Sequence, residues 1–422
     1  MVERQDLLEG RTVFVPRICS GGAELCAAAF RGLGFDAKAC PEGDGPAWEE
    51  TLRCTSGDEC FPQRVVLADF LTALKRSGLE PARAALFITT GRGPCRFGQY
   101  APFLGRALRR LGLGDVHILA PDSDSGYRDV AEYAAPLKRL VWRALLAADY
   151  LRDQLHRTRP YELRAGDADR AHRESLGEAA GVLETRGPNG KGLANLAAAL
   201  GRGRDRFRAV ATLPSRDRLK IGVVGEIFCR LNTFSNDDVV RKIEKLGGEV
   251  QLSGIGEWVW YSNACEWMTL RRTGKTLSRR AAAASLTAWV QSREEAKLLG
   301  ALHDGHEEPS VADLVEFARP YLPWEGVLGE MVLSVGKAIH LQRKGADAIV
   351  DVSPFGCMNG IVSEAVYPRV SRDNGGIPIR VFYVDHATSD LEYGLEIFLE
   401  LAAKYRRGRR GEGGQATCCA AA

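Results

Sequence analysis

The pattern of apolar and polar positions repeats an alternation of short apolar runs and amphipathic segments. From Thr12 to Cys40 the chain reads "TVFVP", "GAELCAAAFRGLG" and "DAKAC", which predicts strand, helix and strand. A second such unit follows in "AALFITT", "QYAPFLGRALRRLGL" and "DVHILAP". Apolar runs bounded by glycine and proline are typical of buried parallel strands. We therefore predict an N-terminal α/β lobe over residues 1–129.

The same alternation returns in the second half of the chain. The runs "LKIGVVGEIF", "EVQLSG", "DAIVDVSPFG" and "IPIRVFYVD" predict four strands, and Asn236 is placed to cap the helix after the first of them. This predicts a C-terminal α/β lobe over 218–405 with a helical insertion, its last helix spanning Leu391 to Tyr405. The fold class is thus α/β, with two lobes that each contain a parallel sheet.

Two segments lie outside these lobes. Residues 130–217 are helical in pattern and highly charged, so we predict a helical bridge. Residues 406–422 are rich in glycine and arginine and have no apolar period, which predicts a disordered tail. Cys418 and Cys419 fall in this tail and are expected to be bystanders.

Composition narrows the range of partners and compartments. The 422 residues are 45% hydrophobic and 26% charged, and the formal net charge is +3. These values are ordinary for soluble domains and imply no nucleic-acid partner. No signal pattern and no apolar run of membrane-spanning length occurs, so we expect a cytoplasmic protein. In that reducing compartment the 11 cysteines favour metal or redox chemistry over disulfides.

Three cysteines share one local context. Cys60 in "SGDECFP", Cys95 in "GRGPCRFG" and Cys357 in "SPFGCMNG" each occupy a glycine- or proline-marked turn ahead of a predicted helix. Cys95 and Cys357 also follow apolar strands, which places them at the carboxyl edge of a parallel sheet, where open α/β folds bind ligands. Helix N-termini stabilise thiolates. We therefore expect these three residues to be ligands.

The alternative is that cysteines are small buried hydrophobic residues, and we expect this for five others. They are Cys19, Cys26, Cys40, Cys229 and Cys265. Structural zinc normally requires four ligands with closely paired cysteines, and no CxxC occurs in the chain. Three dispersed thiolates suit an iron-sulfur cubane instead, with one iron left open.

At these residues the chain resembles the 2-hydroxyacyl-CoA dehydratase family, and in particular its activase-related and double-cubane cluster proteins. The strings that carry the resemblance are "TSGDECFP", "GPCRFGQY", "GVVGEIFCRLNTFSN" and "SPFGCMNGIVSEA". The resemblance implies two flavodoxin-like (Rossmann-like) lobes whose parallel sheets flank a cleft. It also implies an oxygen-sensitive [4Fe-4S] cluster on Cys60, Cys95 and Cys357, which a separate ATP-dependent activase loads with one low-potential electron. It further implies a homo- or heterodimeric lyase or reductase component that acts on a small molecule such as an acyl-CoA.

Other residues in these strings are candidates for tuning or catalysis. Arg96 can balance the charge of a cluster, the alternative being a solvated arginine. Glu226 and Arg230 follow the "KIGVVG" strand and are candidate catalytic residues, although a local salt bridge would explain them equally well. Only Cys54 offers an extra ligand for a double-cubane [8Fe-9S] cluster, so we expect a single cubane.

Two further functions remain open. The chain could be a non-catalytic iron-sulfur carrier or a double-cubane scaffold that docks another redox protein. It could also be a nucleotide-binding α/β protein, but neither "GRGPCR" nor "GVVGE" matches GxGxxG, and no Walker A motif occurs.

Overall fold

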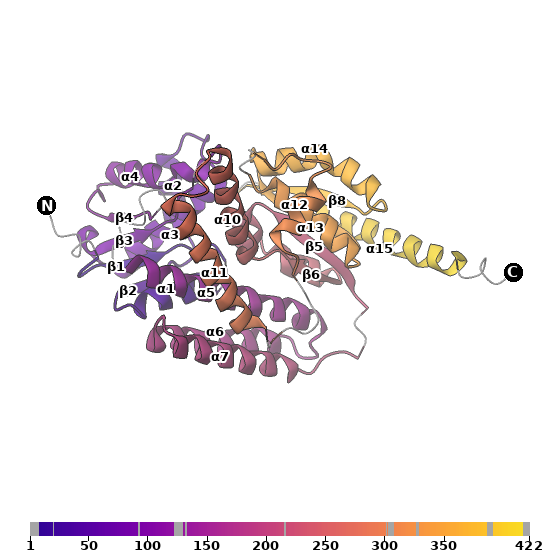
Figure 1. Cartoon of the computed structure of the whole chain (residues 1–422), viewed down its shortest axis with the longest axis horizontal. Helices are drawn as coiled ribbons and strands as arrows, with labels where there is room; N and C mark the ends of the chain where they lie inside the picture. The colour runs from indigo at the N-terminus through magenta and orange to yellow at the C-terminus, as the bar shows by residue number, and fades with distance from the viewer. Residues whose placement is uncertain are drawn as a thin grey trace. The chain divides into compact units, whose positions relative to one another are not determined.

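The computed structural model describes residues 8–19, 21–91, 93–121, 130, 133–214, 217–300, 302, 308–325, 329–385 and 391–416. The chain divides into two compact units, each built around one parallel sheet (Figure 1). The first unit comprises Met1–Leu155, Gly166–Val210 and Ser262–Glu307; the second comprises His156–Ala165, Ala211–Tyr261 and Glu308–Ala422. The predicted α/β class with two flavodoxin-like lobes is confirmed.

The sheet of the first unit has the strand order β2-β1-β3-β4, and every pairing is parallel. Its strands are β1 (Thr12–Val15), β2 (Asp36–Ala39), β3 (Ala84–Phe87) and β4 (His117–Leu119). The central strands β1 and β3 are buried throughout, which explains why their sequences are continuous apolar runs. This is the order of the first four strands of flavodoxin-like folds.

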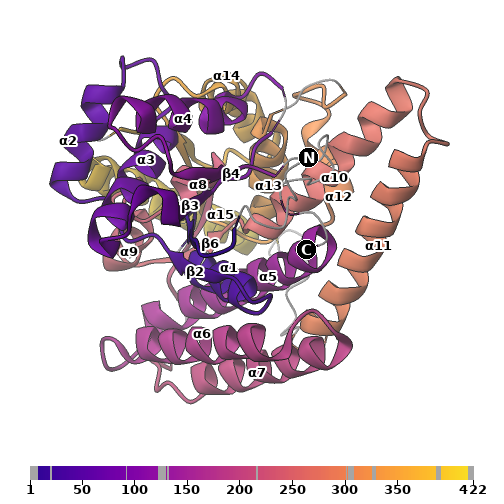
Figure 2. The same ribbon diagram turned by 90° about the vertical axis from the view of Figure 1, so that its left-hand side faces the viewer.

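Helices cover both faces of this sheet. On one face lies α1 (Gly22–Arg31), and on the other lie α2 (Gly45–Cys54), α3 (Phe61–Ser77) and α4 (Tyr100–Arg110) (Figures 1 and 2). The hairpin of α6 (Asp167–Arg186) and α7 (Gly190–Arg208) packs outside α1, and α11 (Arg279–Leu299) packs on α7.

The helices predicted as a bridge thus pack largely within the first unit. The ion pair of Arg31 with Glu184 joins α1 to α6, and that of Arg143 with Glu294 joins α5 (Ala134–Thr158) to α11. In each ion pair the two residues lie more than 140 positions apart in the sequence, so the local pattern of these helices does not reveal which helices they pack against.

The second unit repeats the topology of the first. Its sheet has the order β6-β5-β7-β8, again all parallel. Its strands are β5 (Leu219–Gly225), β6 (Gly248–Leu252), β7 (Ala348–Pro354) and β8 (Ile379–Val384). From β5 the chain adds β6 on one side of the sheet and then crosses over to add β7 and β8 on the other side, so the topological switch point lies between β5 and β7. Open α/β folds bind ligands beside such switch points.

The strand order determines on which face of the second sheet each connecting helix packs. On one side α13 (Met331–Arg343) packs on β5 and β7, α14 (Met358–Asp373) packs on β7 and β8, and α12 (Val311–Ala318) packs on α13. Because crossovers between parallel strands are right-handed, α9 (Val239–Lys245) lies on the opposite face, where it contacts α15 (Leu391–Ala416). The short α8 (Ile227–Leu231) follows β5, and α10 (Ile255–Arg272) follows β6.

Two helix boundaries differ from the predictions. The helix expected to start after Asn236 begins at Val239, because Asp237 and Asp238 adopt left-handed backbone conformations. The C-terminal helix continues to Ala416 instead of ending at Tyr405. Arg406 and Arg410 pair with Asp217, and Arg409 pairs with Asp347, which holds the extended helix against the unit. Cys418 and Cys419 lie outside the described residues.

No helix in the described ranges combines the length and the apolar character that a membrane-spanning helix requires.

Candidate functional site

Cys60 and Cys95 both occupy the N-cap position of a helix in the first unit, as predicted. Cys60 precedes α3, and Cys95 precedes a short 3-10 helix, Arg96–Gln99, that leads directly into α4. The Sγ of Cys60 accepts a hydrogen bond from the Tyr100 hydroxyl at 3.4 Å, and the Sγ of Cys95 accepts one from the Phe97 backbone amide at 3.5 Å. The rings of Phe97 and Tyr100 pack edge to face at 5.2 Å. The two cysteines therefore share one neighbourhood.

Cys357 occupies the equivalent position in the second unit. It is the N-cap of α14 and lies three residues beyond the end of β7. Its amide donates to the Pro354 carbonyl at 3.0 Å, and its carbonyl accepts from the Ile361 amide at 3.1 Å. Cys95 is exposed, whereas Cys60 and Cys357 are half-buried.

A glycine with positive φ stands just before Cys95 and Cys357. Gly93 has φ of 106° and Gly356 has φ of 72°, both in the region that L side chains rarely adopt. These glycines allow the chain to turn sharply from the strand end into the helix that each cysteine caps.

A buried polar network fixes the start of α14. Asp351, fully buried on β7, accepts hydrogen bonds from the Tyr367 hydroxyl at 2.6 Å and the Ser353 hydroxyl at 2.7 Å. The Asn359 amide donates to Ser353 Oγ at 3.3 Å, and Asn359 lies two residues beyond Cys357. The sequence analysis missed this network, although a lone aspartate inside the apolar run "AIVDVSP" is a usable signal.

Two carboxyl groups converge on the first turn of α8. Glu226 is its N-cap and accepts from the amides of Phe228 at 3.1 Å and Cys229 at 2.8 Å, while Glu330 accepts from the Ile227 amide at 3.0 Å. Burial raises the pKa of Glu226, and burial together with the neighbouring charge of Glu226 raises the pKa of Glu330 to about 8. Such a pair can hold a proton at neutral pH. Nothing local in the sequence marks Glu330.

Arg230 is the second candidate catalytic residue, and its side chain contacts backbone carbonyls. Its guanidinium is buried and donates to the backbone carbonyls of Gly225, Ser253 and Gly254, so it fastens the carboxyl ends of β5 and β6. Its charge also lowers the pKa of Glu226 against the effect of burial.

The two remaining candidates have simpler surroundings. Arg96 is exposed on the surface of the first unit. Cys54 is the last residue of α2, and burial raises the pKa of its thiol.

The carboxyl cluster predicts a specific pH dependence of stability. The surroundings of Glu330 in the native state raise its pKa to about 8, whereas its ordinary pKa is 4.5. Over this interval the native state binds more protons than the unfolded chain, so the free energy of unfolding falls as pH rises, by at most about 1.4 kcal/mol per pH unit for this group. Asp351, whose pKa burial raises to about 6, acts in the same direction.

Glu330→Gln is expected to flatten this decline, which urea denaturation at several pH values between about 5 and 8 measures. The matched control is Glu316→Gln, which removes an exposed carboxylate of the same unit. Equal slopes in the wild type and the Glu330 variant would contradict the assignment.

The geometry defines a class: a two-lobed, flavodoxin-like α/β protein with helix-capping cysteines beyond the strand ends of both lobes. No protein-family model matches the chain, and no curated protein matches it either. In the described part of the chain, no three His, Cys, Asp or Glu side chains form a ready ligand group for a metal ion.

Proposed function

We propose that this protein is an iron-sulfur redox protein resembling 2-hydroxyacyl-CoA dehydratase components. In this proposal Cys60, Cys95 and Cys357 hold a [4Fe-4S] cluster, and an ATP-dependent activase supplies the electron that is passed to a small substrate. The observation that carries the proposal is the shared N-cap position of the three cysteines.

The donor chemistry of these residues fits such a group. Thiolate is the usual ligand of iron-sulfur clusters, and a helix N-terminus lowers the cost of keeping a thiol deprotonated. The Tyr100 hydroxyl and the Phe97 amide already donate to the sulfurs of Cys60 and Cys95. Hydrogen bonds to ligand sulfurs are one means of setting the potential of a cluster. When bound, the cluster would supply one-electron transfer at low potential.

The chain's own residues would have three tasks. Asp351, Ser353 and Asn359 hold the start of α14 and thereby position Cys357. Arg230 holds the ends of β5 and β6. Glu226 and Glu330, with raised pKa values, can store a proton at the carboxyl end of β5 that would accompany electron transfer.

A second candidate has an observation in its favour. Cys95 is exposed, as expected for a carrier that brings its cluster to the surface of a partner protein. The enzyme and the carrier differ in their electron acceptor: a small substrate oxidises the reduced enzyme, and a partner protein oxidises the reduced carrier.

Anaerobic purification followed by iron and sulfide quantification tests the proposal. A single cubane predicts about four irons and about four acid-labile sulfides per chain, and a double cubane about eight irons. The dithionite-reduced protein is expected to give an EPR signal. Loss of that signal on adding a 2-hydroxyacyl-CoA favours the enzyme, and loss only with a protein acceptor favours the carrier. Bound zinc without sulfide would refute both.

A further inference from the structure

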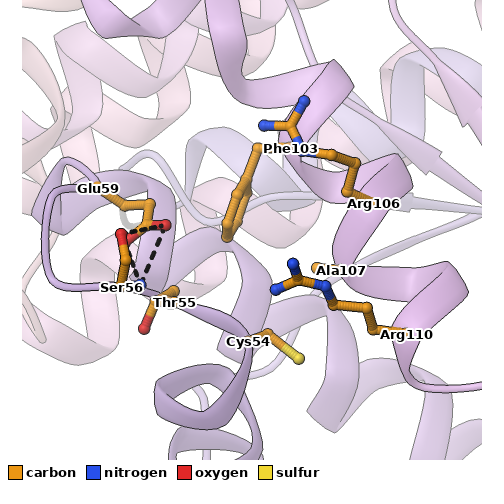
Figure 3. Close-up of a pocket in the computed structure, with 8 residues that line it drawn as sticks. All are labelled: Cys54, Thr55, Ser56, Glu59, Phe103, Arg106, Ala107 and Arg110. Atoms are coloured by element: carbon orange, nitrogen blue, oxygen red, sulfur yellow. Dashed lines mark hydrogen bonds between the residues drawn. The ribbon is translucent and has the colours of Figure 1, made fainter.

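The segment that leads to Cys60 and the helix α4 enclose a pocket of about 220 Å³ within the first unit (Figure 3). Its lining residues are Cys54, Thr55, Ser56, Glu59, Phe103, Arg106, Ala107 and Arg110. Figure 3 shows the guanidinium groups of Arg106 and Arg110 extending from α4 toward the segment with Ser56 and Glu59. The pocket is smaller than the roughly 300–1,000 Å³ of sites for drug-sized ligands.

The two arginines give this pocket its positive charge. Arg106 and Arg110 are four residues apart on α4, so their side chains leave the same face of the helix. Neither has an ion pair or hydrogen bond with any residue that the structure describes. By contrast, Arg31 and Arg143 of the same unit are both paired with glutamates.

The other polar groups of the lining leave this charge largely uncompensated. The carboxylate of Glu59 accepts from the backbone amides of Ser56 at 2.9 Å and Gly57 at 3.1 Å. It is therefore engaged with its own loop. The Cys54 thiol stays neutral at physiological pH because burial raises its pKa. Two guanidinium charges thus face a single carboxylate.

We propose that this pocket binds the phosphate group of a small ligand. A guanidinium presents a planar fork of N–H donors that matches two phosphate oxygens, and two such groups can neutralise a dianion. A singly charged carboxylate would gain less from two cations at a solvent-exposed site. All lining residues belong to one unit and none is among the three cysteines proposed to hold the [4Fe-4S] cluster, so the pocket and the cluster can be tested separately.

The test is calorimetric titration of the full-length protein with orthophosphate and with pyrophosphate in low-salt chloride buffer. We expect saturable binding to the wild type that weakens as sodium chloride is added. Arg106→Gln and Arg110→Gln are each expected to weaken binding by about 10-fold or more, since each removes a charge-assisted contact. The matched control is Arg109→Gln, which removes an exposed arginine of the same helix that does not line the pocket.

Absence of binding to the wild type, or an equal loss in the Arg109 variant, would overturn the proposal. The phosphate group could come from free phosphate or from a phosphorylated metabolite, and the affinities for orthophosphate and glycerol 1-phosphate distinguish them. Equal affinities indicate free phosphate, and tighter binding of the ester indicates a phosphorylated metabolite. Peptide-resolved alkylation locates the site, because pyrophosphate should slow modification of the pocket residue Cys54 but not of Cys265 on α10. Protection of both cysteines or of neither would count against the pocket.

Discussion

Replacement of Cys95 by serine is expected to lower the iron content of the anaerobically purified protein from about four atoms per chain to below about one. The hydroxyl of serine is a much poorer ligand for iron than a thiolate, and two remaining thiolates hold a cubane weakly. Cys95 is exposed, so the substitution should leave folding unaffected. Iron and sulfide quantification and the visible absorbance of the cluster measure the outcome.

The same loss is expected for Cys60→Ser and Cys357→Ser, because the proposal assigns all three residues to one cluster. Cys265→Ser is the matched control, since Cys265 is another half-buried cysteine, on α10, without the N-cap position. Full iron content in any one of the three variants would remove that residue from the ligand set. A loss in the control as large as in the variants would show that the effect is not specific to the site.

Replacement of Glu294 by alanine is expected to destabilise the first unit by about 3–5 kcal/mol. Glu294 is 3% exposed and Arg143 1% exposed, and their side chains meet in two hydrogen bonds of 2.7 and 3.1 Å. Without Glu294 the Arg143 guanidinium is a buried charge whose remaining partners are the carbonyls of Pro188 and Asn189. Breaking one side of a buried pair costs far more than an exposed ion pair contributes.

Urea denaturation measures this change, and hydrogen exchange of the α11 peptides locates it. The control is Arg139→Ala: Arg139 also binds Glu294, but its side chain is 43% exposed, and we expect a cost of at most about 1 kcal/mol. A Glu294 variant within about 1 kcal/mol of the wild type would show that the first unit does not depend on this pair.

Both lobes were predictable because their central strands are largely apolar runs. Strands such as "AALF" and "AIVDVSP" are buried on both faces, and this burial is visible in the composition of each segment. The N-cap positions of Cys60, Cys95 and Cys357 were predictable for a similar reason. The adjoining glycine and proline residues signal a turn, and the amphipathic segment that follows signals a helix.

The surroundings of the candidate site were predicted less well. Arg230 was a candidate catalytic residue, with a local salt bridge to Glu226 as the alternative. In the structure its guanidinium donates to carbonyls at the ends of β5 and β6, the latter more than 20 residues away. Glu330 accepts from the Ile227 amide of α8 across 103 residues of sequence, and no feature next to Glu330 indicates this.

The sequence by itself determined the strands, the helices, the class of the fold and the place of the three cysteines at helix starts, because hydrophobic periodicity and turn residues act over a few neighbouring positions. The tertiary structure alone decided which carboxyl groups are buried together, which arginines are paired with carboxylates and which line a pocket. Those properties depend on burial and on distances between groups that are remote in the chain, and electrostatic interactions become strong only where folding removes water.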